Sequence, residues 1–259
     1  MFRLPQRRLP AWAQEVEDAR AAYEALAPLS AERLGELAGW LLLEQVTHEM
    51  RLDGYRLERE RLRQLLLEGG RGETPEEHLA LGFAAAVQRL SAYVASGLEE
   101  GRPVELTLEL LLDLARLSMG RTESGMGLLR HQRVNPLYPE HDPCSPEELP
   151  HLLPLALEWF AAESFAELSP IEQAALVHVR LMDLQPFERP YQRVARLAAN
   201  LYTLRAGLPP ILIPAEATPV YYEALLSGLR MATGPLVELF ARLVAGTLRT
   251  LRQLVLESA

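Results

Sequence analysis

The chain has 259 residues, a formal net charge of −9 and a single cysteine, Cys144. The acidic balance argues against a general nucleic-acid binder, which needs a basic surface. One cysteine excludes an intramolecular disulfide, which fits a reducing compartment. No apolar run approaches the length needed to span a bilayer, and the N-terminal sequence Met-Phe-Arg-Leu-Pro has no signal-peptide core. We therefore expect a cytoplasmic protein without a membrane partner.

The first part of the chain predicts a small helical extension. Apolar residues at three- and four-residue steps predict three helices, over residues 10–27, 30–52 and 56–68. Ser30 is a typical N-cap for the second helix, and Asp53-Gly54 is a typical C-terminal stop. The glycine-rich loop that follows separates the extension, residues 1–72, from a larger domain, residues 73–259.

The larger domain is also expected to be mostly helical. Three N-cap patterns, each with proline in the first turn and an acid at the third position, predict helix starts at Thr74, Ser145 and Ser169. Helical periodicity predicts spans at residues 74–96, 104–119, 145–164, 169–185, 218–232 and 235–256.

Residues 120–146 are the one long irregular region, rich in Gly, Pro and Asn. Within it we expect a short strand or hairpin at residues 128–134. The same region holds four residues of metal-binding type: His131, Glu140, His141 and Asp142. No fixed helical spacing arranges them as ligands, so we interpret the histidines as exposed loop residues and expect no metal site.

The stretch from Leu181 to Leu197 combines a helix end, a tight turn and a new helix start. Proline at position 186 stops the first helix, and proline at position 190 suits the first turn of the next. Arg193 and Arg196 lie three residues apart, so both project from one face near the start of that helix. Such a helix start can bind an anion. The alternative is that these arginines are solvated or pair with internal carboxylates.

This stretch resembles the core of the Fic family, whose motif reads H-P-F-x-[D/E]-G-N-G-R-x-x-R. When the motif is laid over it without gaps, four residues match: Pro186, Phe187, Arg193 and Arg196. Gln185 stands where the family has its catalytic histidine, and Arg189 stands where it has the metal-binding acid. The Gly-Asn-Gly segment is replaced by Pro190, Tyr191 and Gln192.

Flanking residues extend the resemblance over about residues 75–250. Ala174 and His178 fit an Ala-x-x-x-His pattern that precedes the motif in many Fic domains. The segment from Gly127 to Arg130, Gly-Leu-Leu-Arg, is similar to the Gly-x-Tyr-Arg sequence that leads into the family's flap. In the family this flap docks segments of target proteins, so the resemblance implies a docking site for a protein partner here.

Residues 48–57 resemble the inhibitory helix of many Fic proteins, whose motif reads [S/T]-x-x-x-E-[G/N]. Glu49 occupies the Ser/Thr position and Asp53 the glutamate position. In the family this glutamate pairs with the last arginine of the core motif, so the resemblance implies an inhibitory contact between Asp53 and Arg196. Because Asp53 is one methylene shorter, an ordinary surface Asp-Gly turn is the alternative.

The resemblance implies an all-α, Fic-like helical domain with a short β-hairpin flap and a small helical N-terminal extension. Fic enzymes transfer AMP from ATP to a target hydroxyl, with the histidine as general base and the acid holding Mg²⁺. Gln185 cannot accept a proton, Arg189 would repel Mg²⁺, and Pro190 has no N–H for a phosphate nest. We therefore expect no adenylyl transfer by the family mechanism. No cofactor is expected, and ATP with Mg²⁺ only if the family activity persists.

Three hypotheses follow. In the first, an inactive Fic-like protein binds a phosphate-containing ligand, another anion or a partner segment at Arg189, Arg193 and Arg196. In the second, a residual or altered transferase uses a different base, with three candidates: His131, His178 and Glu188. In the third, the domain is a regulatory scaffold without a ligand that pairs through its helix faces, and a homo-oligomer stays open.

Overall fold

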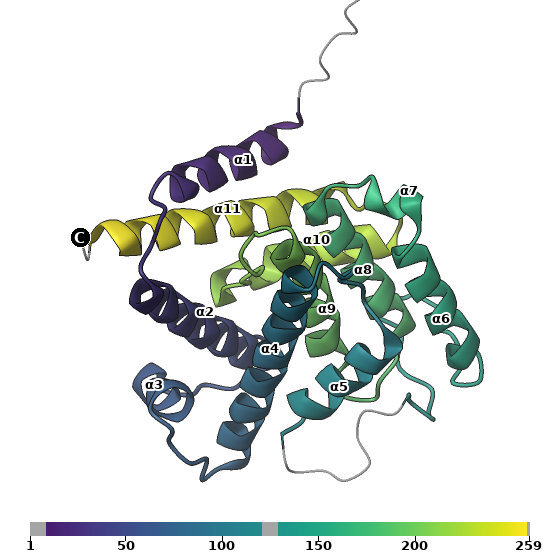
Figure 1. The fold of residues 1–259 in the computed structure, drawn as a ribbon. Coiled ribbons are helices and arrows are strands. Elements are labelled where there is room, and N and C mark those ends of the chain that lie inside the picture. The colour runs from purple at the N-terminus through teal and green to yellow at the C-terminus, as the bar shows by residue number, and fades with distance from the viewer. Residues whose placement is uncertain (1–8, 121–128, 258–259) are drawn as a thin grey trace, which may run out of the picture.

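The structure is a computed structural model that describes residues 9–120 and 129–257. Its described residues form an all-α fold and contain no strand (Figure 1). The N-terminal helices are α1 (Ala11–Glu24), α2 (Ala31–Leu52) and α3 (Arg59–Leu67). The helices that follow are α4 (Pro75–Glu99), α5 (Leu108–Ser118), α6 (Leu149–Phe160), α7 (Glu163–Ala166), α8 (Pro170–Leu184), α9 (Tyr191–Arg205), the short 3-10 helix η1 (Ala215–Ala217), α10 (Thr218–Leu229) and α11 (Gly234–Glu257).

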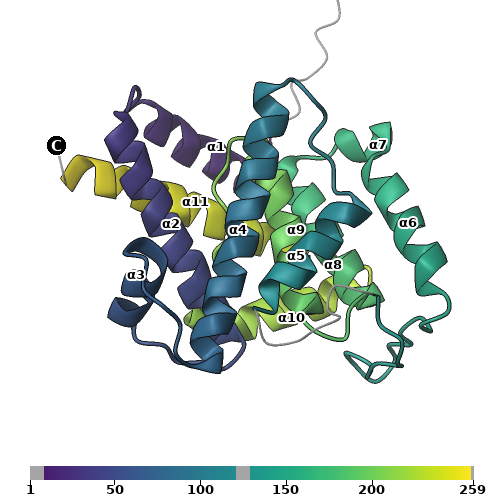
Figure 2. The same ribbon diagram turned by 60° about the horizontal axis from the view of Figure 1, so that its bottom comes forward.

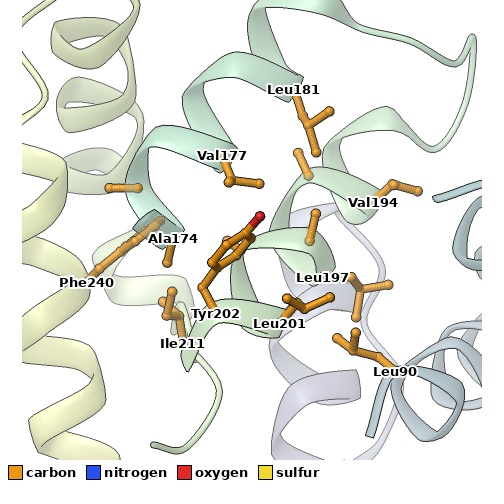
Figure 3. Packing of buried hydrophobic residues seen from close by; sticks show 14 of the residues in the cluster. Leu90, Ala174, Val177, Leu181, Val194, Leu197, Leu201, Tyr202, Ile211 and Phe240 are labelled. Carbon is orange, nitrogen blue, oxygen red and sulfur yellow. The ribbon is translucent and has the colours of Figure 1, made fainter. Parts of the chain in front are cut away.

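Helix α9 is the centre of the fold. Every residue from Arg193 to Thr203 is buried, because α4, α5 and α8 pack around this helix. Apolar side chains of α8, including Val177 and Leu181, and of α9, including Val194 and Leu197, belong to one buried cluster (Figure 3). A helix that is covered on all sides can carry polar side chains only where they find partners, so its two buried arginines require an explanation.

The extension shares this core. Helix α1 lies along α11, and α2 packs on α4 at the other end (Figures 1 and 2). The contiguous hydrophobic core includes residues from all three N-terminal helices, namely Val16, Ala19, Leu43, Val46, Met50 and Leu62. A boundary between residues 72 and 73 stays a prediction, but side chains from both sides of it are buried together.

Local capping explains most helix starts. The side chains of Ser30, Thr74 and Ser169 each accept a hydrogen bond from the backbone N–H three residues later, as the N-cap patterns predict. The prediction at Ser145 is wrong. The Glu148 carboxylate accepts from the Ser145 backbone N–H at 2.7 Å, and the Ser145 carbonyl accepts from the Glu148 N–H at 3.2 Å. These bonds close a turn, so α6 begins at Leu149.

The expected hairpin at residues 128–134 is absent from its described part, residues 129–134. The backbone N–H of Arg130 donates to the carbonyl of Pro186 at 2.9 Å. This part of the segment is therefore bonded to the α8–α9 turn, in place of the ladder of a hairpin. Residues 121–128, which include Gly127, lie outside the described residues.

By length and composition alone, helix α4 could cross a membrane, contrary to the expectation that no run would reach that length. It packs against α2, α3, α5 and α9 and contributes Phe83, Val87 and Leu90 to the core. A core helix passes the same test, so this finding is weak evidence for a membrane span.

Candidate functional site

The motif lies in the turn between α8 and α9. Gln185 ends α8 in the left-handed conformation, with φ 42° and ψ 59°, and its backbone N–H donates to the carbonyl of Leu181. A left-handed residue after the last helical turn is a common helix terminator, although glycine usually occupies it. Pro186 and Phe187 follow and are buried, so these two matching residues act as scaffold.

The Gln185 side chain is also buried, with 2% of its surface exposed. Its Nε2 donates to the carbonyl oxygen of Asn135 at 3.3 Å. An amide has no proton-accepting nitrogen near neutral pH, and this one ties the irregular region 129–148 to the end of α8. The side chain at the family's histidine position therefore has a structural contact and no basic atom.

Arg130 is the second anchor of this turn and is 2% exposed. Its guanidinium donates to the carbonyl oxygens of Gln185 at 2.9 Å, Gln132 at 3.0 Å and Cys144 at 2.5 Å. The carbonyls at the end of α8 lack helical partners, and a cation there also complements the helix dipole. Arg130, which the resemblance places at the flap, thus joins the start of the irregular region to the motif.

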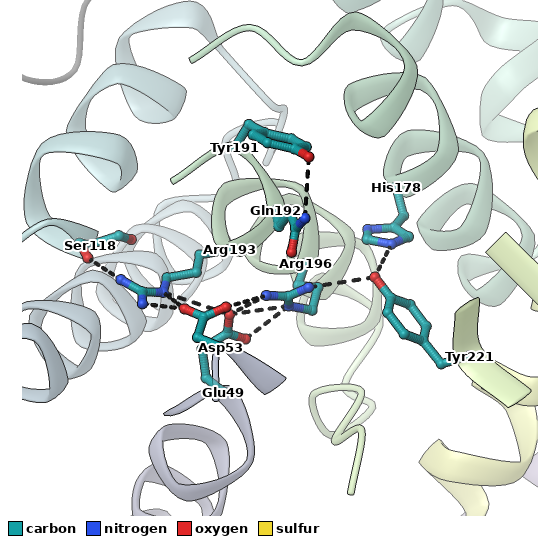
Figure 4. A network of polar contacts seen from close by, with 9 residues as sticks. All are labelled: Glu49, Asp53, Ser118, His178, Tyr191, Gln192, Arg193, Arg196 and Tyr221. Carbon is teal, nitrogen blue, oxygen red and sulfur yellow. Dashed lines mark hydrogen bonds and ion pairs between the residues drawn. The ribbon is translucent and has the colours of Figure 1, made fainter. Parts of the chain in front are cut away.

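Two arginines of α9 meet two carboxylates of α2 (Figure 4). Arg196 binds Glu49 through both of its donor nitrogens on that side, with Nε 2.9 Å from Oε2 and 3.2 Å from Oε1. Arg193 binds Asp53, and its Nη1 donates to the main-chain carbonyl of Ser118 at 3.0 Å. Glu49 and both arginines are buried, while the Asp53 side chain is 18% exposed.

The pairing differs from the one the resemblance implies. Asp53 comes within 3.7 Å of Arg196, but its main partner is Arg193, and Glu49 is the main partner of Arg196. Sequence reasoning missed Glu49 as a partner. The spacing could have indicated it: Glu49 and Asp53 lie four residues apart on one helix, and Arg193 and Arg196 lie three apart on another. Each set projects from one face, so the two sets can form two ion pairs. Whether the contact inhibits anything stays a prediction.

The network continues into the core through Tyr221 of α10. Arg196 Nη1 lies 3.5 Å from the Tyr221 oxygen, which is 2.8 Å from Nε2 of His178. Because Arg196 donates to that oxygen, the hydroxyl hydrogen can be directed to His178. Burial raises the pKa of Tyr221 to about 12. Burial and then the charge of Arg196 lower the pKa of His178 to about 3. His178 is fully buried and neutral, so it does not fit the role of a catalytic base.

The remaining motif residues face an open cleft of about 620 Å³. Glu188 and Arg189 are exposed at its edge, and Pro190 is buried. The cleft lies between the motif turn, the end of α2, the start of α4 and the end of α5; its lining includes Leu52, Asp53, Tyr55, Pro75, Leu79, Met119, Tyr191 and Arg193. Of the three predicted anion-binding arginines, only Arg189 has no ion pair among the described residues.

The motif turn differs from the family motif at its metal-binding and phosphate-binding positions. Among the described residues, no group of three His, Cys, Asp or Glu side chains could hold a metal ion. His131 is exposed, whereas His141 is buried: its Nδ1 accepts from the Leu137 N–H at 2.9 Å, and its Nε2 faces Asp183 at 3.2 Å. In the motif turn, Pro190 offers no N–H, and Asp53 and Glu49 already neutralise both arginines.

The fold and the motif turn define a Fic-type domain, and comparisons with known proteins agree. The Fic/DOC family matches residues 105–203. Protein adenylyltransferase fic-1 of Caenorhabditis elegans is 29% identical over 184 residues, which cover 70% of this chain and 35% of the relative. The central part of the chain is thus similar to the Fic/DOC family, and the fold is that of Fic proteins.

Two solved structures are similar along most of the chain. Fic-1 from C. elegans superposes with a TM-score of 0.79 at 25% identity, over 93% of this chain and 70% of that one. A Fic domain-containing signaling protein from Bacteroides thetaiotaomicron has a TM-score of 0.78 at 21% identity, over 92% and 97% of the two chains. The chain spans about a third of the length of the curated relatives it matches, which are named as protein adenylyltransferases.

Proposed function

We propose that this protein is a Fic-fold binding module that does not catalyse adenylyl transfer and that binds an anionic ligand or an acidic partner segment at its motif arginines. The observation that carries this proposal is the state of the arginine pair. Arg193 and Arg196 are held by Asp53 and Glu49, and the side chain at the histidine position, Gln185, is buried against a main-chain carbonyl. Guanidinium charge persists here, while proton acceptor, metal ligand and glycine loop are missing.

In this proposal α2 closes the site. A phosphate or carboxylate from outside would bind the arginines in place of the α2 carboxylates, because both kinds of anion accept the same charge-assisted hydrogen bonds. Asp53 is the carboxylate nearer to solvent and lines the cleft, so an entering anion would displace it first. Glu49 is buried and bidentate, so it would stay on Arg196 longer.

Calorimetry of the full chain with ATP, ADP and GTP, each with and without Mg²⁺, tests the proposal. We expect no magnesium-dependent complex, and no transfer of labelled AMP to proteins of a lysate. The variant E49Q/D53N should bind tripolyphosphate at least roughly tenfold more tightly than the wild type, because a charge-assisted hydrogen bond is worth that much or more. E36Q, which changes an exposed carboxylate of α2, is the matched control. A magnesium-dependent nucleotide complex in the wild type would overturn the proposal.

A residual transferase is the second candidate, supported by the position of Glu188. Its exposed side chain lines the 620 Å³ cleft, whereas His178 is buried and His131 has no place in the lining. If labelled nucleotide were transferred, E188Q should abolish the transfer and H131Q should leave it intact. Transfer that persists in E188Q would exclude Glu188 as the base.

A protein partner fits either candidate. The Fic structure IbpAFic2 has been solved covalently tethered to Cdc42, at 17% identity and a TM-score of 0.52 to this chain, so a Fic fold can hold a protein. For this chain we place the partner at the segment around Arg130, beside the motif turn. Crosslinking from an exposed position of that segment, such as Gln132 replaced by a photoreactive residue, should capture it, and prior addition of tripolyphosphate to E49Q/D53N should reduce the capture. Crosslinking that the anion does not alter would separate the partner from the arginine site.

A further inference from the structure

A second and larger cleft, of about 810 Å³, lies on the other face of α4. Pro75 and Leu79 line the cleft at the motif turn, whereas His78, Leu81 and Ala85 line this one. Its other walls are the loop at residues 70–72 and the C-terminal end of α5. Its volume falls within the range of small-molecule sites in proteins, roughly 300–1,000 Å³.

Close packing of α4 and α5 gives this cleft a firm wall. A Cβ atom on Gly82 would come within 2.5 Å of the Cα of Gly120, and a Cβ on Gly120 would come within 2.7 Å of the carbonyl oxygen of His78. The two backbones are therefore in direct contact at this point. Because α4 and the residues after α5 touch through glycines, they cannot approach further, so this wall of the cleft is close-packed.

Among the described residues that line this cleft, every side chain that can carry charge is basic. Its described lining includes Arg71, His78 and Arg116 and no carboxylate, in a chain with a formal net charge of −9. Among the described residues, no carboxylate lies within 4.0 Å of the Arg71 guanidinium, while Arg116 is 54% exposed and approaches Asp113 at 3.6 Å. A cleft lined by one sign of charge concentrates ions of the other sign.

The acidic residues on either side of the loop at residues 70–72 form ion pairs with arginines of α3. Arg61 of α3 binds Glu77 and lies 3.9 Å from Glu73, and Arg63 of α3 binds Glu68 and Glu60. The hydrogen bonds from Arg61 lower the pKa of Glu77 to about 2, so this carboxylate stays ionised and paired. The carboxylates around Arg71 are thus directed to α3, which leaves positive charge at the cleft.

We propose that this cleft binds a small organic anion with an apolar body. Leu81, Ala85 and Leu117 supply the apolar surface, and Arg71 and Arg116 contact the phosphate or carboxylate. This site is separate from the motif turn and does not depend on the function proposed for it.

Titration of the full chain with three naphthalene probes and with inorganic phosphate tests the site. We expect 1-naphthyl phosphate and 1-naphthoate to bind. The neutral 1-naphthalenemethanol, which lacks the anionic group, and inorganic phosphate, which lacks the apolar ring, should bind at least roughly tenfold more weakly. The ratio of phosphate to carboxylate affinity identifies the preferred headgroup. Equal binding of the neutral probe, or no binding of either anion, would overturn the proposal.

Variants locate the binding. R71A and R116A should each weaken 1-naphthyl phosphate roughly tenfold, and A85W should fill the apolar part and abolish binding. R102A, which changes an exposed arginine just beyond the C-terminal end of α4, is the matched control, and R189A distinguishes this cleft from the motif cleft. If R189A weakens binding and R71A/R116A does not, the site assignment is wrong. R71A and R116A change exposed side chains, so the test does not depend on whether A85W folds.

Discussion

Among the described residues, the buried arginines Arg130 and Arg196 find hydrogen-bond partners of different kinds. Arg130 and Arg196 are both almost fully buried, at 2% and 7% exposure. Arg130 gives its hydrogen bonds to main-chain carbonyls at the end of α8 and in the irregular region. Arg196 gives most of its bonds to the side chain of Glu49 on another helix. Burial and the nearby charge of Glu49 act in opposite directions on Arg196, and the net effect raises its pKa.

The difference concerns what can be exchanged. Carbonyl oxygens belong to the backbone, so Arg130 can lose them only if the turn unfolds. Carboxylate side chains can be replaced by another anion without moving the backbone of α9. We therefore interpret Arg130 as a structural anchor of the turn. The ion pairs between α2 and α9 are the contacts that an anionic ligand can displace. Substitutions of Arg130, Glu49 and Asp53 test this interpretation, from the largest expected effect on stability at neutral pH to the smallest. A substitution of His178, which is expected to act only at lower pH, comes last.

Replacing Arg130 by alanine should have the largest effect. It removes the donor of the buried bond to the Gln185 carbonyl and of the part-buried bonds to Gln132 and Cys144, and we expect the free energy of unfolding to fall by about 4 kcal/mol. R130K keeps the charge but loses the planar fork, and should cost about 2 kcal/mol. Urea unfolding monitored by circular dichroism measures both. A loss below about 1 kcal/mol for R130A would contradict the assignment of Arg130 as the structural anchor of the turn.

Replacing Glu49 by alanine should lower the free energy of unfolding by about 3 kcal/mol, because Arg196 then stays buried without its main partner. The double variant E49M/R196M removes both charges and fills the space with apolar atoms, so it should lie within about 1 kcal/mol of the wild type. E36A, on the exposed face of α2, is the control. An equal loss in the single and double variants would show that packing, and not charge, determines the cost.

Replacing Asp53 by asparagine should lower the free energy of unfolding by about 1 kcal/mol. The side chain is partly exposed, and Arg193 retains its bond to the Ser118 carbonyl. The same change should strengthen the binding of tripolyphosphate, measured by calorimetry, since Arg193 then faces the cleft with its charge less well neutralised. If D53N binds no better than the wild type, α2 does not close the site.

His178 gives a pH dependence of stability rather than a change at neutral pH. Its pKa is about 3 in the folded protein, against about 6.5 in an unfolded chain. The unfolded state therefore binds a proton that the folded state refuses, and stability falls as the pH drops from about 6.5 towards 3, by about 1.4 kcal/mol per pH unit. In H178Q, the decrease between pH 7.5 and 5 should be smaller by roughly 2 kcal/mol. Parallel pH profiles for both proteins would mean that His178 is not a buried neutral group.

Much of the fold follows from local sequence. Three of the four predicted serine and threonine caps are present, and the motif turn lies between two helices where the two prolines predict it. The physical reason is that caps, proline stops and helical periodicity depend on residues within about one helical turn. Ser145 shows the limit of such local prediction. Its backbone N–H donates to Glu148 within a turn, and α6 begins four residues later, at Leu149.

The site depends on contacts that no local pattern contains. The sequence by itself determined that residues 49 and 53 are acidic, that 193 and 196 are arginines, and that position 185 has no titratable group. Only the tertiary structure decided that Glu49 pairs with Arg196 and Asp53 with Arg193, across about 140 residues of chain. Which carboxylate meets which arginine depends on how α2 docks against α9, and that docking is set by the apolar side chains packed around both helices.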